Sequence, residues 1–169
     1  MISRYAHNLR VDIAHKLFKV MPGKNEVSWT ALLTGYVNCR RVEEAMKLFE
    51  MMFDKSLTAC NVMLLGLGQN GKVSEVRRIF DWMEEKDDGT WSIMITGYER
   101  SGCELEALDT FRCMQRVGVK ANYLALISIH SVFSVVACFD HRKEIHTEVM
   151  KLGFNTDVFV STALITMYI

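Results

Sequence analysis

The sequence predicts an all-α fold, a right-handed α-solenoid of stacked helix-turn-helix repeats, and two observations lead to this prediction. Residues of one kind recur every 31 positions in several separate columns. Within each period, apolar residues recur at intervals of three and four, the spacing of one face of an α-helix. The columns are Phe18, Phe49, Phe80 and Phe111; Met21, Met52, Met83 and Met114; Ala14, Ala45, Val76 and Ala107; and Gly35, Gly66 and Gly97. Such a period indicates a solenoid built from one supersecondary unit.

The first helix of a repeat is clearest around Trp29. Trp29, Leu32, Leu33 and Tyr36 are separated by three, one and three positions, which predicts a helix over residues 27–37. The recurring glycine falls inside this helix, where it costs about 1 kcal/mol relative to alanine. Because the cost recurs in each repeat, we expect these glycines to let adjacent helices approach closely.

The second helix follows a turn at residues 38–41. Val42, Ala45, Phe49 and Met52 are separated by three, four and three positions, so their apolar side faces the first helix. Later turns are predicted at 70–71 and 101–102, where a glycine permits a positive φ after a helix. A lone hairpin leaves one flank of both helices exposed, so the hairpins must stack to be stable.

Composition gives no overall electrostatic signal. The 20 basic and 20 acidic residues cancel, which leaves no gross field for nucleic acid or for an anionic membrane. The first-helix segments with their turns nevertheless carry six basic and three acidic residues, an excess whose sign suits a phosphate backbone. Both a nucleic-acid surface and ordinary scatter remain open readings. The apolar stretch 124–139 is broken by serine and histidine, so we expect a buried helix and no membrane span.

The five cysteines are odd in number and lack Cys-x-x-Cys spacing, so we expect small core residues in a reducing compartment. No targeting segment is recognisable, and Met1 falls inside a repeat, so we expect the chain to be an excerpt of a longer array. No spacing of histidine with cysteine suggests a metal site, and no deaminase signature occurs. We therefore predict no catalytic residues, no metal and no cofactor, hence no enzyme.

Several strings closely resemble the pentatricopeptide repeat family, over essentially the whole chain. They are residues 27–36 (VSWTALLTGY), 42–49 (VEEAMKLF), 90–98 (TWSIMITGY), 118–122 (GVKAN) and 151–160 (KLGFNTDVFV). In that family's framing the chain is a single array of a partial repeat 1–25, repeats 26–56, 57–87 and 88–122, a long-type repeat 123–157 and a partial repeat 158–169. The mixed lengths resemble the plant organelle subclass with short, standard and long repeats.

The resemblance implies a function in RNA binding. Such arrays bind single-stranded RNA, one base per repeat, in the mitochondrion or chloroplast, of which we favour the mitochondrion. They serve organelle RNA processing such as C-to-U editing, splicing or stabilisation. The expected partners are therefore single-stranded organelle RNA and RNA-processing or editing proteins, and no membrane.

The fifth and last residues of each repeat resemble the family's base-reading pair. The pairs are Thr30 with Ser56, Asn61 with Asp87, Ser92 with Asn122, and Ile127 with Asp157, and Asn25 and Thr162 are unpaired halves. An Asp side chain only accepts, which suits uracil or guanine, whereas Asn also donates and suits adenine or cytosine. The family's rule gives uracil for the second pair and adenine for the third. Along RNA read 5′ to 3′ we predict purine, U, A and an unspecified base.

The resemblance also assigns a clamp around each base to the second residue of successive repeats. These residues are Val27, Thr58, Gly89, Leu124 and Phe159, and Arg100 is a candidate phosphate contact. Gly89 offers almost no clamping surface, so we expect weak RNA affinity. Departures from the family pattern concern packing: Arg4 replaces the recurring glycine, Phe53 and Glu84 replace the proline represented by Pro22, Cys60 replaces the Trp29/Trp91 aromatic, and Arg142 replaces a small residue.

Two other functions stay open at the level of sequence. Helical-hairpin solenoids commonly present a groove to peptides, so a protein-protein interaction scaffold is the alternative to RNA binding. A truncated product without independent activity is the third, because a solenoid needs polar caps at its ends. Trp29 and Trp91 could stack on bases, but their place on the packing stripe predicts core positions.

Overall fold

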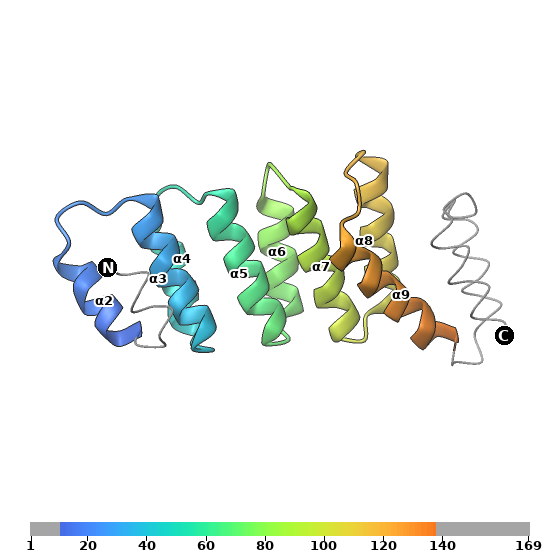
Figure 1. Cartoon of the computed structure of the whole chain (residues 1–169), viewed down its shortest axis with the longest axis horizontal. Coiled ribbons are helices and arrows are strands. Elements are labelled where there is room, and N and C mark those ends of the chain that lie inside the picture. The colour runs from blue at the N-terminus through green and yellow to red at the C-terminus, as the bar shows by residue number, and fades with distance from the viewer. Residues whose placement is uncertain (1–10, 138–169) are drawn as a thin grey trace. The chain divides into compact units, whose positions relative to one another are not determined.

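The computed structural model describes residues 11–137, and every regular element in this range is an α-helix (Figure 1). In chain order the helices are α2 (Val11–Val20), α3 (Glu26–Asn38), α4 (Val42–Met51), α5 (Leu57–Gln69), α6 (Val73–Trp82), α7 (Asp88–Arg100), α8 (Glu104–Arg116) and α9 (Tyr123–Ala137). The predicted alternation of first and second helices is confirmed, and the fold is an all-α helical-repeat solenoid. None of these helices is long and apolar enough to cross a membrane.

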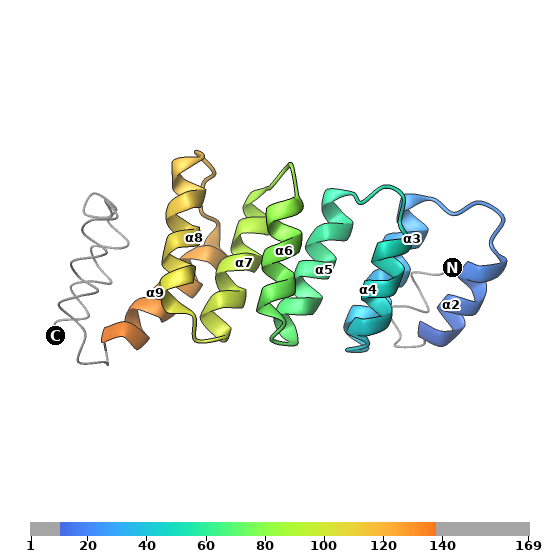
Figure 2. The ribbon, with the colours of Figure 1, turned by 180° about the vertical axis from the view of Figure 1, so that it is seen from behind.

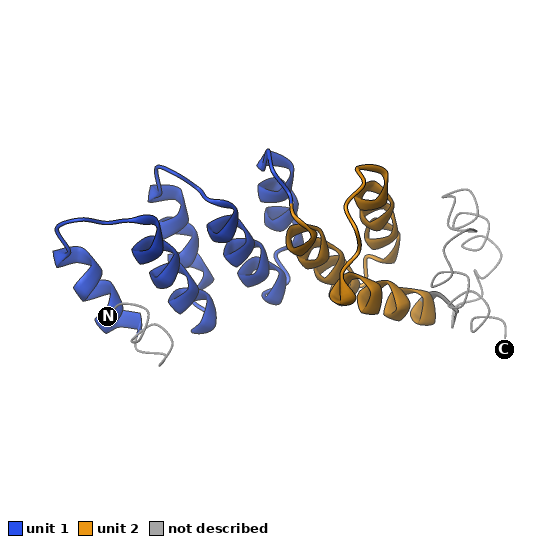
Figure 3. Ribbon diagram, turned by 45° about the horizontal axis from the view of Figure 1, so that its top comes forward, with its two compact units in different colours: residues 1–86 blue, residues 87–169 orange. Residues whose placement is uncertain are grey.

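The chain divides into two compact units, residues 1–86 and 87–169 (Figure 3). In the first unit α3 packs on α2, α4 and α5, and α5 packs on α4 and α6. In the second unit α7 packs on α8 and α9, and α8 packs on α9. Neighbouring first helices therefore contact each other directly within each unit. The reverse view shows α4 against α3 in the first unit (Figure 2).

The repeating columns form the core of the hairpins. The alanine, valine and phenylalanine columns of the second helices are buried throughout, and Met52, Met83 and Met114 are buried while Met21 is half-buried. On the first helices Leu32, Leu33 and Tyr36 are buried, as the stripe around Trp29 predicts. Burial of such side chains removes apolar area from water at about 25 cal/mol per Å², so the periodic columns are the main source of stability.

Glycine closes the turns between the two helices of a repeat. Gly71 and Gly102 have φ values of 69° and 67°, as predicted, and each follows the first helix of its repeat. The equivalent position in the preceding repeat holds Arg40, whose φ is 56°. Only glycine adopts this left-handed region without steric cost. Arg40 therefore occupies a glycine position, and its strain is confined to one turn.

The prediction about the recurring helical glycines is confirmed at Gly66 and wrong at Gly97. A Cβ atom built at Gly66 would lie 2.7 Å from Val37 Cγ2, so α5 approaches α3 at the distance that a side chain would prevent. A Cβ at Gly97 would meet nothing within 4 Å. The periodic pattern alone cannot separate these cases, because the need for glycine depends on the facing side chain.

A lysine follows each of the second helices α2, α4 and α6 of the first unit, four residues after the last residue of the helix. Its Nζ donates to the carbonyl of the methionine three positions earlier, and the same ammonium lies 5.0 to 5.5 Å from a buried phenylalanine ring. The sets are Lys24 with Met21 and Phe18, Lys55 with Met52 and Phe49, and Lys86 with Met83 and Phe80. A cation at a helix C-terminus satisfies an otherwise open carbonyl and complements the helix dipole. Lys24, Lys55 and Lys86 thus form a fifth column with the 31-residue period, which a pattern of apolar residues does not include.

The cysteine prediction is correct only in part. Cys60 is buried and Cys39 and Cys103 are intermediate, but Cys113 is exposed on α8. Position 113 lies in the column of Met51 and Trp82, both of which are also exposed. The same position is thus exposed in three successive repeats, so Cys113 lies outside the apolar stripe that packs in the core. Cys138, Arg4 and Arg142 lie outside the described residues.

Candidate nucleic-acid interface

The four fifth-position residues lie one turn into the first helices. Thr30, Asn61, Ser92 and Ile127 are each the fifth residue of their helix, α3, α5, α7 and α9. Their exposure differs: Ser92 is buried at 1%, Thr30 and Asn61 are half-buried, and Ile127 is 45% exposed. These four residues therefore share the same position in their helices, but their side chains differ in burial.

The last residue of a repeat stands immediately before the first helix of the next repeat and caps it. Asn25 Oδ1 accepts from Ser28 N at 2.9 Å, Ser56 Oγ from Ala59 N at 3.3 Å, Asp87 Oδ1 from Thr90 N at 2.7 Å, and Asn122 Oδ1 from Ala125 N at 3.1 Å. Each bond satisfies one of the open amides of a helix N-terminus. Sequence reasoning missed this role, although Asn, Ser and Asp are the residue types that N-caps prefer.

The structure brings one predicted pair, Ser92 and Asn122, into direct contact. Ser92 Oγ lies 2.7 Å from Asn122 Oδ1 and also 2.6 Å from the carbonyl of Asp88. On its other side, Asn122 Nδ2 donates to Asp88 Oδ2 at 3.0 Å. The amide oxygen of Asn122 is therefore turned toward the protein, and its NH₂ group is turned toward an exposed carboxylate.

Thr30 and Ser56, which form the first predicted pair, are not joined in this way. Thr30 Oγ1 is buried and has no hydrogen-bond partner, so it is not bonded to Ser56. Asn61 belongs to the first compact unit and Asp87 to the second. Ile127 has no hydrogen-bonding group, and Asp157 and Thr162 lie outside the described residues. A buried hydroxyl without a partner is uncommon, which makes Thr30 a site where an added polar group would be stabilising.

The predicted clamping residues lie mainly on the surface. Val27 is 69% and Leu124 47% exposed, Thr58 is exposed, and Gly89 is half-buried. Phe159 lies outside the described residues. The face of a base is apolar, and an exposed aliphatic side chain such as Val27 or Leu124 can contact it.

Ion pairs reduce the basic excess of the first-helix side. Arg41 Nη1 lies 2.6 Å from Asp12 Oδ1, and its Nη2 lies 2.8 Å from Glu44 Oε1. The hydrogen bond from Arg41 lowers the pKa of the Asp12 carboxyl, and the same pair raises the pKa of Arg41. Lys72 likewise pairs with Glu43. Arg40 and Arg100, by contrast, are exposed.

The part of the chain that the structure describes offers no candidate metal site. Over residues 11–137 no three His, Cys, Asp or Glu side chains gather where they could hold a metal ion. The geometry supplies hydrogen-bonding groups, exposed apolar side chains and two exposed arginines. These groups can bind a polymer of bases and phosphates through contacts alone.

Comparison with known protein families gives matches along most of the sequence. A model of the PPR repeat family matches residues 24–59. A model of the PPR repeat matches residues 1–26, 58–87 and 89–119. Together these matches cover well over half of the chain.

Relatives with similar sequences come from Arabidopsis thaliana. Two mitochondrial pentatricopeptide repeat-containing proteins are 48% identical over 69 residues (41% of this chain) and 47% identical over 68 residues (40%), each match covering 10% of the relative. A chloroplastic pentatricopeptide repeat-containing protein is 36% identical over 63 residues, or 37% of this chain and 7% of the relative. The chain thus spans about a tenth of the length of the relatives that it matches.

The crystal structure of the pentatricopeptide repeat protein PPR10 from maize has a similar fold. The TM-score is 0.53 and the sequence identity 17%, and the match covers 99% of this chain and 30% of that protein. At this identity the similarity concerns the fold alone.

Proposed function

The chain belongs to the pentatricopeptide repeat family, and from this membership we propose that it binds single-stranded RNA in a base-specific manner. The observation that supports the proposal best is the contact between Ser92 and Asn122, the fifth and last residues of one repeat, which meet at the start of α9. In a helical-repeat array, polar side chains at fixed places hydrogen-bond to exposed base edges, one base per repeat. The paired residues that the structure describes recur at fixed places, the fifth position of a first helix and the position before the next first helix.

The chemistry of the Ser92 and Asn122 pair fits adenine. Asn122 Oδ1 is engaged by Ala125 N and Ser92 Oγ, so the Nδ2 donor is the group that a base must address. Adenine offers a ring nitrogen acceptor at its Watson–Crick edge, whereas uracil offers a ring N–H there. To reach Nδ2, adenine would take the place of the Asp88 carboxylate. Asp88 therefore competes with the base, and the affinity of this site includes the cost of releasing it.

In the proposal the full recognition order is purine, U, A and one unspecified base. The array acts as an address for organelle RNA processing such as editing, splicing or stabilisation, while catalysis belongs to other domains or partner proteins. Relatives named mitochondrial and chloroplastic support a plant organelle, either mitochondrion or chloroplast, as its location.

The test is a competition between short single-stranded RNAs that differ only at the base opposite Ser92 and Asn122. The variant Ser92→Asn with Asn122→Asp reproduces the pair found at Asn61 and Asp87. Because aspartate caps a helix as well as asparagine does, α9 keeps its N-cap. We expect the preferred base to change from adenine to uracil, with at least a tenfold reversal in relative affinity.

Asp88→Asn is the matched control. It removes the competing charge but keeps an acceptor for Asn122, so we expect tighter RNA binding with the adenine preference retained. A preference that does not follow the exchanged pair would contradict base reading by these residues. Salt-sensitive binding with no base preference would leave only a nonspecific phosphate-binding surface.

A further inference from the structure

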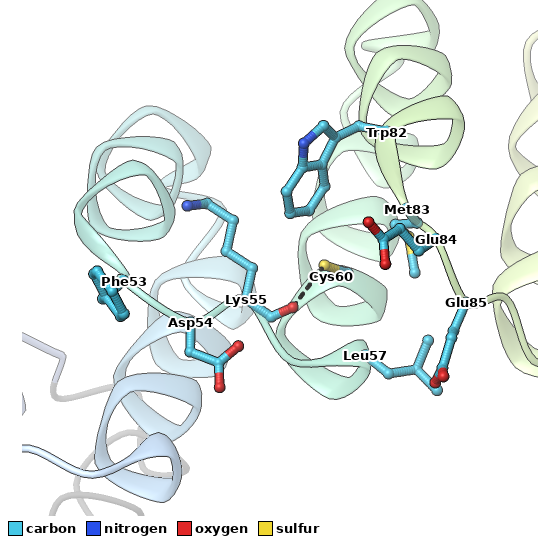
Figure 4. A pocket seen from close by; sticks show the side chains of 9 residues that line it. All are labelled: Phe53, Asp54, Lys55, Leu57, Cys60, Trp82, Met83, Glu84 and Glu85. Carbon is cyan, nitrogen blue, oxygen red and sulfur yellow. Dashed lines mark hydrogen bonds between the residues drawn. The ribbon is translucent and has the colours of Figure 1, made fainter.

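A pocket of about 420 Å³ opens at the loop ends of the hairpins in the first compact unit. It lies between the loop that follows α4 and the loop that follows α6, with the first turn of α5 between them (Figure 4). Its lining residues all belong to the first compact unit, whereas Ser92 and Asn122 belong to the second.

The pocket can be traced to one departure from the repeat. Cys60 occupies the column of Trp29 and Trp91. Trp29 packs edge-on against Phe18 at 4.7 Å between ring centroids, and Trp91 is 7% exposed, so an indole fills this place in both flanking repeats. Cys60 is buried at the same place but lacks the ring. Interiors are otherwise close-packed, so a missing indole leaves space unless neighbours collapse into it.

Two aromatic residues, Phe53 and Trp82, line this pocket. Trp82, the last residue of α6, is 60% exposed, and Phe53 in the opposite loop is fully exposed. Lys55 Nζ lies 6.0 Å from the Trp82 ring but donates to the carbonyl of Met52 at 2.9 Å, so its charge is engaged within its own loop. Large exposed aromatic side chains beside a pocket are typical of interaction sites.

The rim of the pocket is acidic. Asp54, Glu84 and Glu85 are exposed carboxylates, and Lys55 is the one basic residue among the lining side chains. This charge repels the phosphates of RNA and attracts arginine and lysine. Two aromatic lining residues with an acidic rim therefore favour a peptide over a nucleic acid.

We propose that this pocket binds a peptide segment of a partner protein in which an aromatic side chain is flanked by basic residues. The aromatic side chain enters the space above Cys60 and contacts Trp82, and the flanking basic residues pair with Asp54, Glu84 and Glu85. None of the lining residues is itself a proposed base-reading residue, but Ser56 lies in the chain between the lining residues Lys55 and Leu57. Competition between the peptide and RNA therefore tests whether one chain can hold both. The proposal does not depend on RNA binding.

The test uses three fluorescein-labelled synthetic peptides and fluorescence anisotropy at low salt. The first has the core Arg-Lys-Phe-Arg-Lys, the second replaces the phenylalanine by alanine, and the third replaces the four basic residues by glutamate. We expect the first peptide to bind at least tenfold more tightly than either of the others. Equal binding of the first two, or no saturable binding of the first up to millimolar concentration, would overturn the proposal.

Cys60→Trp is the decisive variant, because it restores the residue of the column and fills the pocket. We expect the affinity of this variant for the first peptide to fall at least tenfold. Its helical circular dichroism and its RNA affinity should stay unchanged. Glu84→Lys with Glu85→Lys alters exposed side chains only, so it tests the acidic rim in a folded protein. We expect this double variant to lower the affinity for the basic peptide by a similar factor. Unchanged peptide binding in both variants would overturn the assignment. Loss of RNA binding in Cys60→Trp, with RNA displacing the peptide from the wild type, would instead make the pocket part of the RNA surface and refute the proposal.

Discussion

At the scale of single residues, Arg40 shows how a repeat tolerates one unfavourable backbone conformation. Its φ of 56° matches the values of Gly71 and Gly102 at the same place in the next two repeats. The side chain is exposed, so nothing in the core holds it there. A substitution at Arg40 therefore changes the cost of the backbone conformation without changing the packing of the core.

Arg40→Gly is expected to stabilise the protein by about 1 kcal/mol, since glycine adopts a positive φ without a Cβ clash. Urea unfolding followed by circular dichroism measures the change. Gly71→Ala is the converse control and should destabilise by a similar amount. A destabilised Arg40→Gly variant would show that the arginine side chain contributes more than its backbone costs.

Gly66 and Gly97 give a second pair of predictions with opposite sign. Gly97→Ala should stabilise by about 0.5 to 1 kcal/mol, because alanine is the better helix former and its Cβ meets open space. Gly66→Ala should lose about 1 to 3 kcal/mol, because its Cβ overlaps Val37 and forces overpacking. Thermal unfolding of both variants measures these two changes in stability. Gly66→Ala with Val37→Ala should recover stability if the clash is the cause.

His15 makes the stability of the first unit depend on pH. It bonds to the Tyr36 hydroxyl, and burial, with smaller effects of Lys19 and Arg41, lowers its pKa below the ordinary 6.5. The unfolded chain therefore takes up this proton at a higher pH than the folded protein does. Stability is fully present above pH about 6.5 and falls as the pH drops from there toward the folded pKa.

Denaturant unfolding between about pH 7.5 and pH 5 should show this loss, and His15→Gln should abolish it. The carboxyls of Asp12, Glu44 and Glu75 have lowered pKa values, so their contributions change below this window. A pH dependence that persists in His15→Gln would assign the effect to another group.

At the scale of elements, the ends of the helices carry most of the specific polar contacts. First helices begin with a side-chain cap, whereas α4, α6 and α8 begin at Arg41, Lys72 and Cys103 without one. Arg41 and Lys72 form ion pairs with the preceding second helix instead. The polar contacts at the start of α4 and α6 thus come from the preceding second helix. Those at the start of a first helix come from the residue immediately before it.

The lysine in the loop after a second helix can also be tested by substitution. Lys86→Met removes the hydrogen bond to the Met83 carbonyl and the contact with the Phe80 ring, and we expect a loss of about 1 kcal/mol. Lys47→Met, on the exposed face of α4, is the control and should change stability by less than about 0.5 kcal/mol. Urea unfolding of the two variants separates them, and equal effects would exclude a special role for Lys86.

The sequence predicts these elements well because each rests on a local pattern. The stripe around Trp29, the turn at Gly71 and the buried phenylalanine column depend on spacing, which the chain displays directly. The pocket at Cys60 and the open space at Gly97 depend on which side chain faces them from another helix. The bond between Ser92 and Asn122 joins residues 30 positions apart. Such contacts depend on how the helices pack. The sequence therefore predicts that Ser92 and Asn122 form a pair, but not that the Asp88 carboxylate accepts a hydrogen bond from Asn122.

At the scale of the whole molecule, the charges balance and several of them pair locally. With Arg41 and Lys72 in ion pairs and Arg40 and Arg100 exposed, we expect RNA to contact few cations. The logarithm of RNA affinity should fall with the logarithm of salt concentration with a slope of about −1 to −2, near −0.7 for each phosphate contact on a single strand. Arg100→Ala should reduce the slope by about 0.7 without changing base preference. A slope several times steeper would mean that many more cations bind RNA.

The cap at the start of each first helix restricts how such a chain can evolve. The last residue of a repeat holds the next helix in place, and in our proposal it also addresses a base. Replacing it by an apolar residue would cost about 1 kcal/mol of stability whatever its effect on RNA. Asparagine, aspartate and serine all keep the cap, and aspartate and serine are each reachable from asparagine by one nucleotide change in the codon. A lineage can thus change its target transcript in small steps without passing through an unfolded ancestor.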